Sequence, residues 1–117
     1  VRLMEIPTTR SDYRTRSLDR SDLPDDPLDG LAGWLREAEA AGEPEPTAMT
    51  LATVGPDGAP SSRWVLLRGL SADGLTFFSH DDGPKGLAIA HEPRVAAGFW
   101  WPSLERQVRV TGRCAPV

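Results

Sequence analysis

The chain has 117 residues, with 13 Lys and Arg against 17 Asp and Glu, so its formal net charge is −4. This length fits one domain with a real core, and the acidic balance argues against a general nucleic-acid binder. No apolar run approaches the roughly 20 residues of a membrane span, and the first residues lack a signal peptide's apolar middle. The sole cysteine, Cys114, excludes an internal disulfide, so the sequence predicts a cytoplasmic protein.

The first part of the chain is predicted to be an arm followed by a helix. Residues 1–24 are rich in charged and hydroxyl side chains and show neither helical nor strand periodicity, which is typical of an arm. The domain proper is predicted over residues 25–117. It begins with a helix over residues 26–41, for which Asp26 is a good N-cap and Gly42 suits the left-handed position after the last turn.

The remainder is predicted to be mainly β. Short glycine-containing turns, GPDG and SADG, join the first three strands, which indicates an antiparallel meander. A short helix is predicted to begin at Pro84 and to end before Pro93. Five strands with an inserted helix indicate a small barrel or strongly curled sheet. The strands are predicted at residues 48–54, 62–70, 75–80, 94–101 and 106–115.

Three cationic residues are candidates for binding an anion. Lys85 lies near the start of the short helix, where free amides and the helix dipole favour phosphate, although a solvated surface lysine is the commoner role for such a residue. Arg63 and Arg68 bracket the second strand five residues apart, so alternation places them on opposite faces. Arg63 is the better phosphate candidate, because a guanidinium can grip phosphate through two bonds. Residues 65–67 between them offer the apolar surface and backbone groups that an aromatic heterocycle needs.

The stretch FWWPSLERQVRV holds two adjacent tryptophans, followed by Gln107 and Arg109 on one face of a strand. Adjacent residues in a strand point in opposite directions. Trp100 and Trp101 therefore either divide between the core and an exposed ligand or partner surface, or both pack around a curled sheet. The sequence leaves these two arrangements open.

Other catalytic constellations are missing from the sequence. His80 and His91 have no partner at metal-ligand spacing, and neither a nucleophile elbow nor a Walker loop occurs. No pair of nucleophile and base can be named. Redox chemistry would therefore require a bound cofactor.

Taken together, these segments resemble the pyridoxamine 5'-phosphate oxidase family, which are flavin mononucleotide (FMN) enzymes with a split-barrel fold. The resemblance covers roughly residues 13–117, and EPEPTAMTLATV and LERQVRV are its most specific parts. The matching stretches are DPLDGLAGWLREAEAAGEPEPTAMTLATV, GAPSSRWVLLRGL, GLTFFSHDDGPKG and FWWPSLERQVRVTGR.

The resemblance implies an FMN-binding antiparallel split barrel with the cofactor at a homodimer interface. Arg63 and Lys85 would hold the FMN phosphate, and Arg68 would contact a phosphorylated substrate where the family usually has lysine. Arg10 and Tyr13 fall near an N-terminal segment that closes over substrate in some members. The residues implied to contact the flavin are Trp64, Val65, Leu66, Leu67, Phe78, Ser79 and Gln107.

Several positions depart from the family pattern. Pro84 replaces an arginine usual before Lys85, which removes a phosphate donor, and Trp64 stands where methionine is common. Family members continue for a second portion with further substrate and FMN contacts, so the domain is expected to be incomplete. The implied activity is oxidation of pyridoxamine or pyridoxine 5'-phosphate to pyridoxal 5'-phosphate. The alternatives are another flavin or deazaflavin reductase of this fold, or a non-catalytic flavin-binding dimer.

Overall fold

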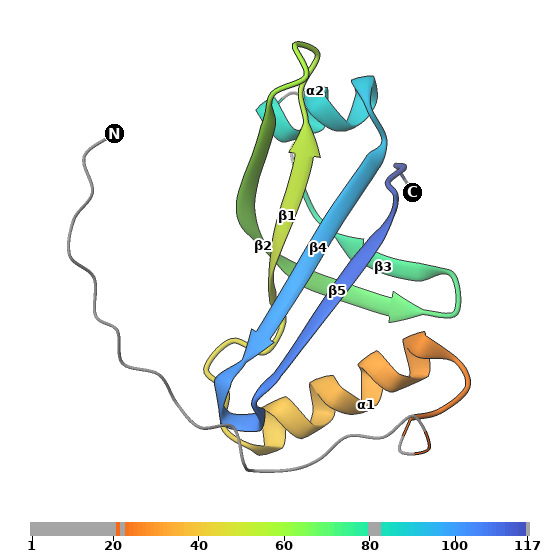
Figure 1. The fold of residues 1–117 in the computed structure, drawn as a ribbon, viewed down its shortest axis with the longest axis vertical. Coiled ribbons are helices and arrows are strands. Elements are labelled where there is room, and N and C mark those ends of the chain that lie inside the picture. The colour runs from red at the N-terminus through yellow and green to blue at the C-terminus, as the bar shows by residue number, and fades with distance from the viewer. Residues whose placement is uncertain (1–20, 22, 80–82, 117) are drawn as a thin grey trace, which may run out of the picture.

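The computed structural model describes residue 21 and residues 23–79 and 83–116 (Figure 1). The predicted arm therefore lies almost entirely outside the described residues. Within them, each predicted helix and strand is present. The elements are α1 (Pro27–Ala40), β1 (Ala48–Val54), β2 (Pro60–Ser71), β3 (Gly74–Phe77), α2 (Pro84–His91), β4 (Arg94–Trp101), the short 3-10 helix η2 (Pro102–Leu104) and β5 (Arg106–Arg113).

Two strands are shorter than predicted. β5 ends at Arg113 because its partner β4 begins at Arg94, which lies directly opposite Arg113. β3 ends at Phe77, the last residue that pairs with β2, and the next residue, Phe78, is 76% exposed. His80, the predicted end of that strand, lies outside the described residues. β3 thus ends where it parts from β2, although β2 itself continues to Pro60.

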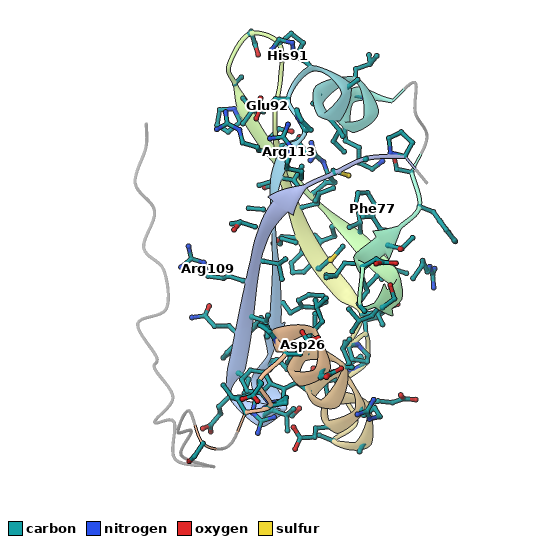
Figure 2. All side chains as sticks on the ribbon, turned by 90° about the vertical axis from the view of Figure 1, so that its right-hand side faces the viewer. Asp26, Phe77, His91, Glu92, Arg109 and Arg113 are labelled. Carbon is teal, nitrogen blue, oxygen red and sulfur yellow. The ribbon has the colours of Figure 1, made fainter. Side chains whose placement is uncertain are left out.

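The predicted cap of α1 is confirmed. The Asp26 carboxylate accepts a hydrogen bond from the Leu28 amide at 2.9 Å, and Pro27 occupies the first turn. Figure 2 shows Asp26 at the end of the helix. Gly42, just after the helix, adopts φ +82°, a left-handed conformation that glycine tolerates best.

Asp26→Ala is expected to lower the free energy of unfolding by about 1 kcal/mol, because the Leu28 amide loses its acceptor. Urea denaturation of the variant and the parent chain measures the loss. Asp25→Ala is the control, since Asp25 is an exposed carboxylate next to the cap. Equal losses in both variants would mean that the cap bond is not the cause.

The strands form one antiparallel sheet in the order β3-β2-β1-β4-β5. The first three strands are the predicted meander, and α2 carries the chain across to β4. Register shifts between Leu67 and Gly69 on β2, and Figure 1 shows the second half of β2 running with β3 across the direction of β4 and β5. The sheet is therefore a strongly curled half-barrel, as predicted, with β3 and β5 at its edges.

The core lies on the concave side of the sheet, against α1. Trp101 is its largest member and is 1% exposed, and its indole N–H donates to the Pro46 carbonyl oxygen at 2.9 Å. The Trp101 ring packs against Phe99 at a centroid distance of 5.4 Å and edge-on against Trp34 at 6.5 Å. The other core residues are Leu31, Ala38, Met49, Leu67 and Leu104.

The core decides between the two arrangements of the paired tryptophans. Trp101 is buried, whereas Trp100 is 47% exposed on the opposite side of the sheet. The same alternation holds on β5, where Val108 and Val110 are half-buried while Gln107, Arg109 and Thr111 are exposed.

Among the described residues, no helix is long and apolar enough to cross a membrane.

Candidate functional site

Arg63 is held firmly by its own hairpin. It lies on β2 directly opposite Leu51 of β1. Its Nη1 donates to the Leu51 carbonyl oxygen and to the Thr53 hydroxyl, both at 2.9 Å, and its Nη2 donates to the Ser61 hydroxyl. A guanidinium has five N–H groups, so these bonds leave two for a ligand. The half-buried head group is thus fixed in place before any anion arrives.

Lys85 lies in the first turn of α2. The helix begins at Pro84, and its N-cap, Gly83, provides no side-chain bond to the first amides. α2 is anchored by the buried Ala88, and Figure 1 shows it beside the end of the sheet where β1 ends and β2 begins. Arg63 is near that same end of β2, so the two predicted phosphate ligands share one end of the half-barrel.

The predicted flavin-contacting residues of β2 are divided between two faces. Leu67 is 5% exposed and belongs to the core, with Val65 packed against the core beside it. Trp64 is 67% exposed on the other side, and alternation places Leu66 and Arg68 there as well. A ligand on that side would meet the side chains of Trp64 and Leu66 but only the backbone of the two core residues.

We call this side of the sheet the outer face. Cross-strand neighbours continue a row across it, from Trp64 through Thr50 and Gly98 to Arg109. Figure 2 shows Arg109 pointing away from the sheet on the side opposite α1. The outer face carries Trp64, Leu66 and Arg68 on β2, Thr50 on β1, Gly98 and Trp100 on β4, and Gln107 and Arg109 on β5.

Small residues, Thr50 and Gly98, lie between Trp64 and Arg109 on the outer face. A Cβ atom on Gly98 would lie 3.1 Å from the Thr50 hydroxyl, so this position is tight for any larger residue. Gln107 is exposed and lies directly opposite Trp100. The paired Trp100 and Gln107 therefore lie beside the small residues Gly98 and Thr50.

All charged side chains on the strands of the sheet are cationic. The strands β1, β2, β4 and β5 carry six arginines and no carboxylate, although the whole chain has a net charge of −4. Arg94 pairs with Glu92 just outside the strand, and Arg106 pairs with Glu37 of α1. The sheet therefore presents a field that attracts anions.

Ion pairing and burial shift the pKa values of Glu92, Arg94 and Cys114. The hydrogen bond from Arg94 lowers the pKa of Glu92 and raises that of Arg94. Burial raises the pKa of the Cys114 thiol. In the part of the chain that the structure describes, no three His, Cys, Asp or Glu side chains gather where they could hold a metal ion. The arginine and lysine side chains at this end of the half-barrel can bind an anion.

The remaining predicted site residues lie after β3 or outside the described residues. Phe78 and Ser79 are exposed and follow β3 directly. Arg10 and Tyr13 lie outside the described residues. Sequence reasoning missed Thr53 and Ser61 as the groups that fix Arg63; the only signal is that hydroxyl residues flank the GPDG turn on both strands of the hairpin.

The family model described as "Pyridoxamine 5'-phosphate oxidase" matches residues 35–117. The chain belongs to the pyridoxamine 5'-phosphate oxidase family. A pyridoxine/pyridoxamine 5'-phosphate oxidase of Cupriavidus pinatubonensis is 48% identical over 115 residues, covering 98% of this chain and 54% of that protein. One of Thermosynechococcus vestitus is 46% identical over 110 residues, covering 94% and 52%. The chain thus spans about half the length of these curated relatives of the oxidase family.

Solved structures show the same fold. PhzG from Burkholderia lata 383, in complex with tetrahydrophenazine-1-carboxylic acid, superposes with a TM-score of 0.80 at 28% identity, covering 86% of this chain and 51% of PhzG. An FMN binding protein of Nostoc punctiforme related to the oxidase family has a TM-score of 0.66 at 24% identity, covering 75% and 47%. A heme binding protein of Mycobacterium smegmatis has a TM-score of 0.53 at 26% identity, covering 71% and 35%. The predicted antiparallel split-barrel fold with flanking helices is confirmed.

Proposed function

We propose that this chain binds FMN within an oxidase that converts pyridoxamine or pyridoxine 5'-phosphate to pyridoxal 5'-phosphate. The observation that carries the proposal is Arg63, which is fixed by three hydrogen bonds and keeps two N–H groups for an anion. Its neighbour at that end of the sheet is Lys85, which adds an ammonium near the amides of the first turn of α2. Together they would hold the FMN phosphate, and residues Phe78 and Ser79 would lie beside the cofactor.

The geometry of the outer face supports a homodimer around the cofactor. Trp64 on β2 and Gln107 on β5 are separated by β1 and β4, so three strand spacings, about 14 Å, lie between their backbones. A single copy could bring both to one flavin ring only if the ring lay across β1 and β4. In our proposal β2 of one copy and β5 of a second copy line the same ring.

FMN, when bound, supplies the acceptor for a hydride from the substrate and passes the electrons to oxygen. The residues of the chain would bind and orient the cofactor and the substrate. The exposed Arg68 on the outer face would hold the phosphate of the substrate, with Arg10 and Tyr13 proposed to close over it. The sheet has no carboxylate that would repel either phosphate. We place this reaction in the cytoplasm.

The similarity to PhzG favours a second candidate. That protein was solved with tetrahydrophenazine-1-carboxylic acid, and an exposed Trp64 on the same face as Arg68 suits a flat anionic ring as well as a phosphate. A flavin-dependent oxidation of an aromatic carboxylate is therefore the alternative reaction. A deazaflavin reductase and a non-catalytic flavin-binding dimer complete the alternatives.

An FMN titration of the purified chain tests the proposal. Flavin fluorescence is expected to be quenched on binding, with a mass in solution of two copies. Hydrogen peroxide is then expected on adding pyridoxamine 5'-phosphate in air. Binding without peroxide would leave a flavin-binding dimer, peroxide only with an aromatic carboxylate would favour the second candidate, and an absence of flavin binding would refute the assignment.

A further inference from the structure

Arg106, the first residue of β5, ties that strand to α1. Its guanidinium forms an ion pair with Glu37 and lies over the ring of Trp34, 4.4 Å from the centroid. The Arg106 side chain is only 15% exposed, although Glu37 is 44% exposed. Trp34 in turn packs edge-on against the buried Trp101. The contacts form a continuous path from the core to the start of β5, which we call the Arg106 clamp (Arg106, Glu37 and Trp34).

The residue before Arg106 has an unfavourable backbone conformation, so the start of β5 depends on the contacts around it. Glu105 has φ +53° and ψ +41°, a left-handed conformation unfavourable for a residue with a side chain. A conformation of this kind persists only where its surroundings impose it. On one side Leu104 is buried in the core, and on the other Arg106 lies on Trp34. The clamp therefore holds one end of a strained turn.

The Arg106 clamp affects the direction in which the Gln107 side chain points, because it fixes the register of β5. Among the described strands, β5 lies at an edge and pairs with β4 alone, and its inner apolar side chains, Val108 and Val110, are half-buried. A slip of one residue would turn Gln107 from the outer face to the inner one. With Arg106 fixed on the inner side, its neighbour must point outward beside Trp100.

We propose that the Arg106 clamp is a positioning device for Gln107, and that it acts on the cofactor only through that residue. Arg106, Glu37 and Trp34 themselves lie on the inner side, away from the outer face where the cofactor ring is proposed to bind. The consequence for FMN rests on the proposed function, in which Gln107 contacts the flavin. The consequence for the register of β5 does not depend on any ligand.

A double-mutant cycle on FMN binding tests the route through Gln107. Arg106→Met is expected to raise the FMN dissociation constant about tenfold, as for one lost hydrogen bond. In a Gln107→Ala background the same change is expected to have less than about a twofold effect, because the residue being positioned is gone. A purely structural role would give the same loss in both backgrounds and would overturn the proposal.

Three further variants sharpen the cycle. Arg106→Lys keeps a cation for Glu37 and Trp34 and is expected to bind FMN within about threefold of the parent chain. Glu37→Gln leaves the contact with Trp34 and serves if Arg106→Met fails to fold; it is expected to weaken binding by about threefold. Arg36→Met is the matched control, since Arg36 is an exposed arginine adjacent to Glu37 on α1, and no change is expected. A loss there equal to that of Glu37→Gln would overturn the proposal.

Amide hydrogen exchange without flavin separates this inference from the proposed function. Arg106→Met is expected to lose protection selectively at residues 106–108, with residues 110–112 little affected. If the parent chain binds no FMN, the proposed function fails and exchange alone decides. Selective loss at the start of β5 then supports the positioning role, and uniform loss or none overturns it.

Discussion

Trp101→Ala is expected to lower the free energy of unfolding by about 3–5 kcal/mol, the largest effect of any single truncation in this chain. Trp101 is 1% exposed and contacts both Phe99 of its own strand and Trp34 of α1. Its loss would leave a cavity between the sheet and the helix, and the Pro46 carbonyl oxygen would lose its donor. Because small domains are stable by only about 5–15 kcal/mol, this loss would remove a large share of the free energy of unfolding.

Trp100→Ala is the matched control for that measurement. It removes the same side chain from the adjacent residue, which lies on the outer face and is 47% exposed. We expect a loss below about 1.5 kcal/mol, and both values come from guanidinium denaturation followed by circular dichroism. Comparable losses in the two variants would contradict the assignment of Trp101 to the core and Trp100 to the outer face.

The strand pattern was predictable because local signals agree with the tertiary fold. Asp26 and Gly42 mark the ends of α1, and the turn sequences GPDG and SADG fix the meander. The bounds of β1 and β4 follow the sequence pattern directly. The ends of β3 and β5 did not, because they depend on how far pairing with the neighbouring strand extends.

The site was only partly predictable, for the same reason. Sequence indicated Arg63 and Lys85 as cations in suitable places, but it could not show that Thr53 and Leu51 hold the guanidinium from the opposite strand. The pairing of Arg106 with Glu37 joins residues 69 apart in sequence, which no local pattern contains. The sequence could not decide which of Trp100 and Trp101 enters the core, because that depends on which face of the sheet packs against α1.

The second large effect is expected for Arg63→Ala, which should act on both FMN binding and stability. Loss of charge-assisted bonds to the cofactor phosphate is expected to weaken FMN binding by about 1–3 kcal/mol, or roughly fivefold to 150-fold. The Thr53 hydroxyl, in a residue only 2% exposed, and the Leu51 carbonyl would also lose their donor. We therefore expect the free energy of unfolding to fall by about 1–3 kcal/mol without any ligand.

Lys85→Ala separates the two effects. Lys85 lies at the start of α2, and its removal is expected to weaken FMN binding by a similar 1–3 kcal/mol, by the same estimate for charge-assisted bonds, with little change in stability. Arg63→Lys tests shape, since one ammonium cannot reproduce the planar set of bonds to Leu51, Thr53 and Ser61. Fluorescence titration with FMN and urea denaturation of each variant give the two quantities. Unchanged FMN affinity in both alanine variants would contradict the placement of the FMN phosphate at this end of the half-barrel. A loss of stability confined to Arg63→Ala would still measure what the three bonds of Arg63 contribute to the hairpin.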